Sequence, residues 1–118
     1  MESKGRLFLI HWNETEAEQL ADPLRASGWE VEVEARDGVR AWNAIKTNPP
    51  RAVAIYLTRL PSHGRETARA LRAFKVTRTI PIIFLDGKEE PLEKTKAKVP
   101  DAVFASSTEL EGILSNLT

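Results

Sequence analysis

The sequence predicts an α/β domain in which a parallel β-sheet lies between two layers of helices. Residues 52–57 (AVAIYL) and 80–85 (IPIIFL) are runs without a charged side chain, as expected of strands buried on both faces. Segments with the apolar spacing of helices separate these runs from each other and from three further strand-like segments. This strict alternation indicates right-handed parallel crossovers and three layers.

The first strand and the first helix follow from a short apolar run and its flanking residues. Residues 7–10 (LFLI) form the first buried strand. Asn13 or Thr15 is suited to cap the helix that follows, and Gly28 is suited to end it. Pro23 lies inside this helix, where it removes one hydrogen bond and can kink the axis.

Residues 29–35 alternate between two faces. Glu30, Glu32 and Glu34 point to one side, and apolar residues point to the other. This pattern is typical of a half-exposed strand at the edge of a sheet, where the glutamates discourage pairing with another sheet. With this strand at the edge, the flavodoxin-like strand order 2-1-3-4-5 is the most economical arrangement.

The remaining elements follow in one continuous domain, residues 1–118. In chain order we expect a helix between Asp37 and Asn48, the central strand at 52–57, a loop at 61–64, a helix at about 65–75, the strand at 80–85, a weak helix at about 91–98, a strand at 102–105 and a helix at 109–117. A chain of 118 residues is long enough for one such core and leaves little for a second.

The composition excludes several classes of function. The 17 basic and 17 acidic residues balance, so nothing predicts affinity for nucleic acid or for an anionic membrane. The absence of cysteine excludes disulfides, thiol catalysis and thiolate metal sites. No apolar run approaches the roughly 18 residues of a membrane span, and the start of the chain does not look like a signal peptide. We therefore expect a cytoplasmic protein.

Four local patterns resemble the receiver domains of bacterial response regulators, the CheY-like superfamily. They are residues 35–42 (ARDGVRAW), 50–55 (PRAVAI), Gly64 with Leu71-Arg72 downstream, and 80–83 (IPII). Each pattern is weak alone, but the four occur in register and with matching element lengths. The resemblance covers essentially the whole chain and implies the same three-layer, five-stranded fold.

The resemblance also implies a set of five reactive positions at the carboxyl ends of the strands. In receivers these are two Mg²⁺-binding acids, a phospho-accepting aspartate, a hydroxyl residue and a lysine. In this sequence the matching positions carry His11 and Trp12, Tyr56, Asp86, and Ser106 or Ser107. None of the five is the residue that the family uses.

These replacements predict a degenerate phosphorylation pocket. Mg²⁺ prefers anionic oxygen ligands, which His11, Trp12 and Tyr56 do not supply. A phenol has a pKa of about 10 and is protonated at neutral pH. Without metal or lysine, the charge that develops on a transferring phosphoryl group has no partner. We therefore expect no catalytic residue, no metal and no cofactor, with His11, Trp12 and Tyr56 filling the pocket, and Asp86 paired with Arg59 or His11.

A protein partner is the expected ligand of such a pseudo-receiver. In receivers, the fourth helix, fifth strand and fifth helix commonly form the contact surface. Here this surface carries Lys94, Lys96, Lys98 and Phe104, which suit an acidic partner or a homodimer. The expected function is therefore phosphorylation-independent protein–protein interaction in bacterial signal transduction, without enzymatic activity.

Alternative functions use the same strand ends. One is a flavodoxin-like protein that binds a small molecule or nucleotide in the strand-end pocket, and another is a minor enzyme that uses His11 and Asp86. Against nucleotide binding, no glycine-rich phosphate loop follows the first strand. An active receiver aligned in another register is also disfavoured, because no pair of acids lies at the exit of the first strand.

Overall fold

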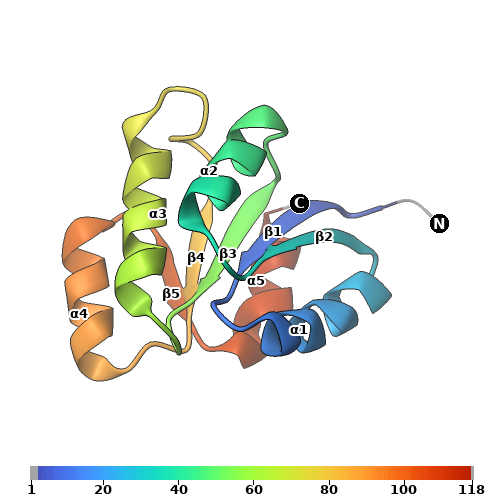
Figure 1. Cartoon of the computed structure of the whole chain (residues 1–118). Coiled ribbons are helices and arrows are strands. Elements are labelled where there is room, and N and C mark those ends of the chain that lie inside the picture. The colour runs from blue at the N-terminus through green and yellow to red at the C-terminus, as the bar shows by residue number, and fades with distance from the viewer. Residues whose placement is uncertain (1–2, 118) are drawn as a thin grey trace.

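The computed structural model describes residues 3–117, without the side chain of Pro61. Five parallel strands form one sheet in the order β2-β1-β3-β4-β5, with helices on both faces (Figure 1). The elements are β1 (Gly5–Ile10), α1 (Glu14–Ala26), β2 (Trp29–Glu34), α2 (Gly38–Thr47), β3 (Ala52–Tyr56), α3 (Pro61–Ala73), β4 (Ile82–Leu85), α4 (Glu89–Lys98), β5 (Val103–Ala105), the 3₁₀ helix η1 (Ser107–Glu109) and α5 (Leu110–Asn116). The predicted fold class and strand order are confirmed. Within residues 3–117, no helix combines the length and apolar character that a membrane crossing requires.

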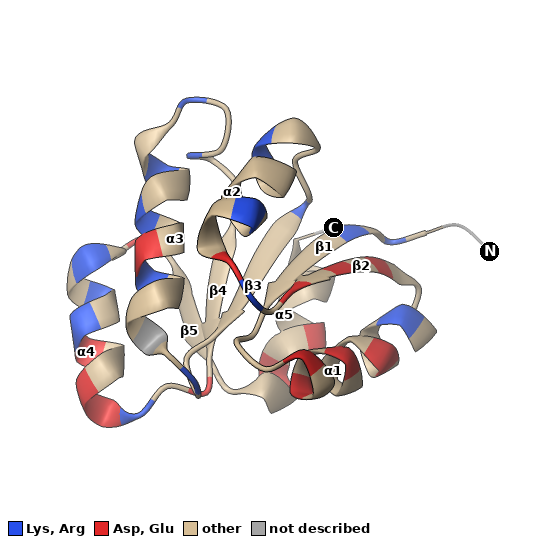
Figure 2. Cartoon of the chain, viewed as in Figure 1, with Lys and Arg blue, Asp and Glu red and all other residues tan. Residues whose placement is uncertain are grey.

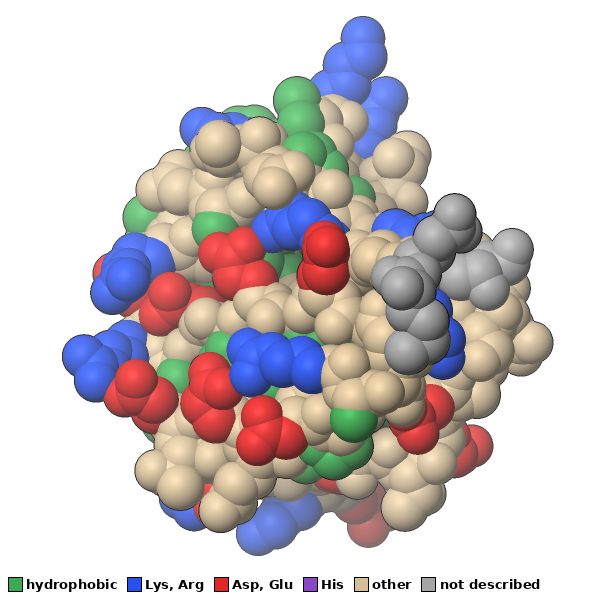
Figure 3. Space-filling model, turned by 90° about the vertical axis from the view of Figure 1, so that its right-hand side faces the viewer, with side chains coloured by type: hydrophobic (Ala, Val, Ile, Leu, Met, Phe, Trp, Pro, Cys, Tyr) green, Lys and Arg blue, Asp and Glu red, His purple; other side chains and the backbone are tan. Residues whose placement is uncertain are grey.

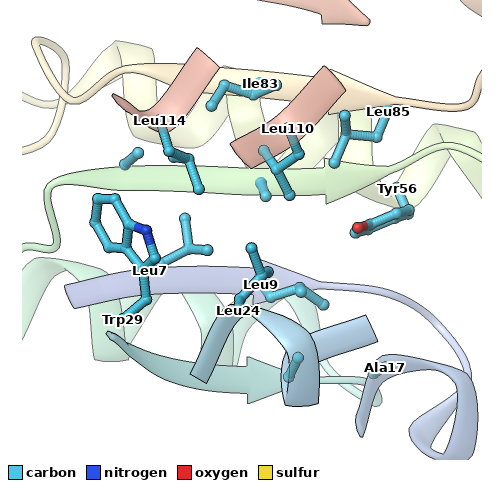
Figure 4. Packing of buried hydrophobic residues seen from close by; sticks show 13 residues of the cluster. Leu7, Leu9, Ala17, Leu24, Trp29, Tyr56, Ile83, Leu85, Leu110 and Leu114 are labelled. Atoms are coloured by element: carbon cyan, nitrogen blue, oxygen red, sulfur yellow. The ribbon is translucent and has the colours of Figure 1, made fainter. Parts of the chain in front are cut away.

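The sheet divides the core into two layers because neighbouring residues of a strand point to opposite faces. Leu7 and Leu9 pack with the helices α1 and α5, whereas Phe8 and Ile10 pack with α2 and α3. Figure 4 shows the first layer, in which Tyr56 lies at the carboxyl end of β3. All five residues of β3 are buried, as expected of the central strand.

Helix α1 begins where the sequence predicted and runs through its proline. The Asn13 side chain caps it by accepting a hydrogen bond from the Glu16 N–H at 3.0 Å. The helix continues past Pro23 to Ala26. Because Pro23 is exposed, water can solvate the carbonyl that loses its helical donor. Gly28 then adopts a φ of 107°, which favours glycine and lets the chain reverse into β2.

Strand β2 is an edge strand, as its alternating pattern predicted. Glu30 and Glu32 are exposed, and Glu32 forms an ion pair with Arg6 on β1 at 2.6 Å. Figure 3 shows the side of the molecule that carries β2 and α1, where acidic and basic side chains lie next to one another. This mixed charge is typical of a solvated surface.

Helix α3 starts earlier than the sequence predicted. The expected loop at 61–64 forms the first turn of the helix, since proline is favoured at the first helical position. Leu60 precedes it with a φ of 43°, in a left-handed conformation that is uncommon for leucine. The chain therefore turns sharply between β3 and α3, directly beside the strand-end site.

Candidate functional site

The carboxyl ends of β1, β3 and β4 meet at one edge of the sheet and border a cavity of about 560 Å³. We call this cavity the crater. Its lining residues are His11, Glu16, Gln19, Leu20, Tyr56, Thr58, Arg59 and Asp86. The structure thus brings together three of the residues predicted from the sequence, His11, Tyr56 and Asp86.

His11 is almost completely buried at the end of β1. Its side chain packs against Tyr56 with ring centroids 5.3 Å apart, and the residue is 3% exposed. Its Nε2 lies 3.3 Å from a carboxylate oxygen of Glu16 and 3.5 Å from the Thr58 hydroxyl. Burial lowers the pKa of His11, with the positive charge of Arg59 acting in the same direction and Glu16 and Asp86 opposing it. The imidazole is therefore neutral at neutral pH.

Glu16 and Arg59 form the polar wall of the crater. The Arg59 guanidinium donates two hydrogen bonds to the Glu16 carboxylate, at 2.9 and 2.7 Å. These bonds lower the pKa of Glu16 and raise that of Arg59. Sequence reasoning missed Glu16, because it lies in the first turn of α1 and looks like an ordinary solvated helix residue. The contact between Arg59 in the β3–α3 loop and Glu16 on α1 is visible only in three dimensions.

Asp86 does not form the pairs that the sequence suggested. Its carboxylate instead accepts a hydrogen bond from the Ser107 backbone N–H at 2.7 Å, while Arg59 is committed to Glu16. Asp86 has a φ of 59°, a left-handed conformation that aspartate tolerates better than most residues. Asp86 therefore ties the end of β4 to the start of η1.

Tyr56 is 3% exposed and occupies the end of the central strand. Burial, and then the negative charge of Asp86, raise the pKa of Tyr56 to about 12. The phenol is thus protonated throughout the physiological pH range. It fills the α1/α5 layer at the carboxyl end of β3 (Figure 4).

Trp12 turns away from the crater, unlike its neighbour His11. Its ring meets the edge of His63 with centroids 5.9 Å apart, between α2 and α3. Gly38 and Gly64 lie next to the indole, since a Cβ at either position would be in ordinary contact with it at 3.8 Å. We expected Trp12 to fill the strand-end pocket, but it does not line the crater.

The serines at the end of β5 act as backbone anchors. Ser106 caps η1 through a reciprocal pair of hydrogen bonds with Glu109, and the Ser106 backbone N–H lowers the pKa of Glu109. Ser107 supplies the N–H that Asp86 binds. Neither serine lines the crater. Among residues 3–117, no group of three or more His, Asp or Glu side chains is placed to hold a metal ion.

The predicted partner surface on α4 and β5 carries balanced charge. Helix α4 has three lysines and three glutamates, with the acidic residues near its start and the basic residues near its end (Figure 2). Lys94 pairs with Glu90 at 3.1 Å, and Lys96 lies over the ring of Phe104 at 5.7 Å. The three lysines, Lys98 included, thus share the helix with an equal number of glutamates, and their role in binding a partner stays a prediction.

Phe104 lies half-buried on β5. Its ring stacks on that of Phe84 with centroids 5.4 Å apart. The neighbouring Val103 is exposed on the edge strand. An apolar component of the predicted partner surface is thus present.

No protein-family model and no curated protein sequence matches the chain. Solved structures do match it. A response regulator from Chloroflexus aurantiacus is 24% identical, with 96% of each chain covered and a TM-score of 0.78. A CheY-like receiver domain from Methylobacillus flagellatus is 20% identical, with 100% of each chain covered and a TM-score of 0.80.

The receiver domain of a sensor histidine kinase from Pseudomonas aeruginosa also matches. It is 23% identical, covers 96% of each chain with a TM-score of 0.75, and holds a magnesium ion in its active-site cleft. The sheet order, the two helix layers and these full-length superpositions agree. The chain therefore has the fold of response-regulator receiver domains.

Proposed function

We propose that this chain is a pseudo-receiver, a receiver-like signalling domain that works without accepting a phosphoryl group on aspartate. One observation carries the proposal. At the end of the central strand, where receivers carry the phospho-acceptor, stands the buried and protonated Tyr56. A neutral phenol with a pKa of about 12 is a poor nucleophile toward a phosphoryl donor.

The charges around Tyr56 support the same proposal. Mg²⁺ requires free oxygen ligands in near-octahedral geometry. The two carboxylates of the crater are already engaged, Glu16 by both bonds from Arg59 and Asp86 by the Ser107 N–H. By contrast, the Pseudomonas receiver domain of the same fold holds a magnesium ion in its active-site cleft. We therefore propose that the residues of this crater stabilise the loops around it.

An enzymatic role for His11 and Asp86 is not favoured by their contacts. The His11 ring faces Glu16, Thr58 and Tyr56, whereas the Asp86 carboxylate binds the start of η1. The neutral His11 has no nucleophile activated beside it, since the Thr58 hydroxyl lies at the long distance of 3.5 Å. A non-enzymatic role is thus part of the proposal.

We propose that this pseudo-receiver binds its partner through the face formed by α4, β5 and α5. The edge strand β5 presents exposed Val103 and half-buried Phe104, with Lys96 over the ring. We propose a protein partner in a bacterial cytoplasmic signalling assembly, or a second copy of the chain. Because the charges of α4 balance, the binding energy would come mainly from the apolar residues.

The proposal is tested by offering the protein a phosphoryl donor. The chain is incubated with acetyl phosphate and Mg²⁺, beside a phosphorylatable receiver as positive control, and the intact masses are measured. We expect the control to gain one phosphoryl group and this chain to gain none. Ordered beryllofluoride and Mg²⁺ beside Tyr56 in a soaked crystal, or a phosphoryl group on Asp86, would refute it.

The partner surface is tested separately. Light scattering coupled to size exclusion reports whether the chain dimerises, and Val103→Glu places a charge on β5 at an exposed site. Loss of dimer or partner binding in Val103→Glu, with retention in Val39→Glu on α2, supports the proposed face. Equal binding by both variants excludes it.

A further inference from the structure

A second cavity, separate from the crater, lies between α2 and α3. Its volume is about 410 Å³, within the range of small-molecule sites, and none of its lining residues lines the crater. Trp12, Val39, Trp42 and Phe74 supply its apolar walls. We call it the α2–α3 cavity. Of the residues predicted for the phosphorylation pocket and the partner surface, only Trp12 lines it.

The walls of this cavity are aromatic and partly exposed. The rings of Trp42 and Phe74 lie 4.9 Å apart at an angle of 59°. Phe74 is 49% exposed and Val39 is 67% exposed, although both are large apolar residues. Apolar side chains that converge on one hollow, rather than lying scattered, indicate a binding site. Aromatic walls favour a flat aromatic ligand, which can lie against the rings.

Two unpaired hydrogen-bond donors belong to the same walls. In the described part of the chain, the indole nitrogens of Trp12 and Trp42 are buried and have no hydrogen-bond partner. Buried polar groups are normally paired, so each is an unused donor. Both nitrogens have almost no accessible surface, so in this conformation neither faces the cavity directly. Hydrogen bonding to a ligand would therefore require the indole to turn about its soft ring torsion.

The rim carries groups that disfavour an anionic ligand. Arg36 is neutralised by Glu14 at 2.6 Å, and Asp37 caps the start of α2 with its carboxylate. Glu66 lines the opposite wall on α3. With Asp37 at the helix N-terminus, an incoming anion meets a negative charge instead of free N–H groups.

We propose that the α2–α3 cavity binds an uncharged, planar heteroaromatic molecule whose ring nitrogens or carbonyls accept hydrogen bonds from Trp12 and Trp42. The unpaired donors favour such a heterocycle over a phenylalanine or tryptophan side chain of a protein partner. Phenylalanine offers no conventional acceptor, and tryptophan is a donor only. This site would give the domain a ligand input that does not depend on the crater.

The three tryptophans provide a direct test by NMR. Trp29 is buried in the α1/α5 layer, on the other side of the sheet, so its indole N–H signal is an internal control. Riboflavin and adenosine serve as uncharged planar probes, and flavin mononucleotide as the anionic counterpart of riboflavin. With ¹⁵N-labelled protein, we expect saturable shifts of the Trp12 and Trp42 indole signals, an unmoved Trp29 signal, and weaker binding of the mononucleotide than of riboflavin.

Matched variants locate the site. Ala70 lines the cavity, and Ala73 lies exposed on the same helix outside it, so Ala70→Phe should abolish the shifts and Ala73→Phe should preserve them. Val39→Glu, at an exposed rim position, provides a second test should Ala70→Phe fail to fold. The proposal is overturned if neither uncharged probe moves the Trp12 and Trp42 signals at its solubility limit. It is equally overturned if the shifts persist in Val39→Glu and in folded Ala70→Phe. These results do not depend on whether Tyr56 or Asp86 can be phosphorylated.

Discussion

Replacing Tyr56 by aspartate, the residue that receivers use at this position, should destabilise this protein strongly and in a pH-dependent way. Tyr56 is 3% exposed, and its environment already raises the pKa of an acidic group through burial and the charge of Asp86. Both effects would act on an introduced carboxyl group. The variant therefore measures how unsuitable the crater is for the anion that phosphotransfer requires.

The expected magnitude has two parts. Removing the buried ring costs up to about 3–5 kcal/mol, the range for deleting an aromatic side chain from a core. An upward pKa shift of about two to three units for the new carboxyl adds about 3–4 kcal/mol at neutral pH. Tyr56→Asn also loses the buried ring, but it introduces no carboxyl group that can ionise. The difference between the two variants isolates the cost of the charge.

The sign of the pH dependence follows from linkage. The folded-state pKa of the introduced Asp lies above the unfolded-state value of about 3.9, so the unfolded state loses its proton first. The penalty is absent below about pH 3.9, grows as the pH rises toward the folded-state pKa and then stays constant.

Urea unfolding followed by tryptophan fluorescence, from about pH 4 to pH 8, measures this penalty. We expect the Asp and Asn variants to converge at the acidic end and to separate at neutral pH. Addition of Asp86→Asn should narrow the gap, because it removes the neighbouring charge. If Tyr56→Asp is as stable as Tyr56→Asn at neutral pH, the crater tolerates an anion and the reasoning fails.

Three further predictions concern titration and packing. The single tyrosine should ionise with a pKa of about 12 in an ultraviolet pH titration, and at a lower pH in Asp86→Asn; an unchanged midpoint would contradict the role of Asp86. Burial lowers the pKa of His11, so the unfolded state binds protons more readily, and the free energy of unfolding should fall as the pH drops below about 6.5. His11→Gln should lack this decline, and equal slopes in both proteins would refute the assignment. Gly64→Ala should cost about 1–3 kcal/mol, because its Cβ would lie 2.7 Å from a β3 side chain. Gly112→Ala, which meets nothing within 4 Å, should instead stabilise α5 by roughly 0.5–1 kcal/mol, and thermal unfolding that ranks the two glycine variants otherwise would contradict the packing.

The fold was accessible from the sequence because its signals are local and repeated. The apolar run of β3, the alternation of β2 and the caps at Asn13 and Asp37 each depend on a few neighbouring residues. The ends of helices and strands were harder to predict where a residue is compatible with two local structures. Pro61, for example, is compatible with a loop and with the first position of a helix.

The candidate site was accessible only in part, because side-chain pairing depends on distant residues. Because His11, Tyr56 and Asp86 lie at or just after the ends of predicted strands, we expected them at one edge of the sheet. All three border the crater there. The sequence does not show that Arg59 reaches across to Glu16, nor that Asp86 turns toward Ser107. Likewise, the α2–α3 cavity joins residues from three separate segments, so no local pattern indicates it.

The packing of Trp12 would make it difficult to introduce an acid at this position. An acid at this position would leave the gap between α2 and α3, beside Gly38 and Gly64, without the ring that occupies it. Introducing acids at the crater alone would therefore loosen the neighbouring helices, and a compensating change on α2 or α3 would be needed at the same time. The packing of Trp12 on one side of the sheet thus limits which residues the carboxyl edge of the sheet can accept.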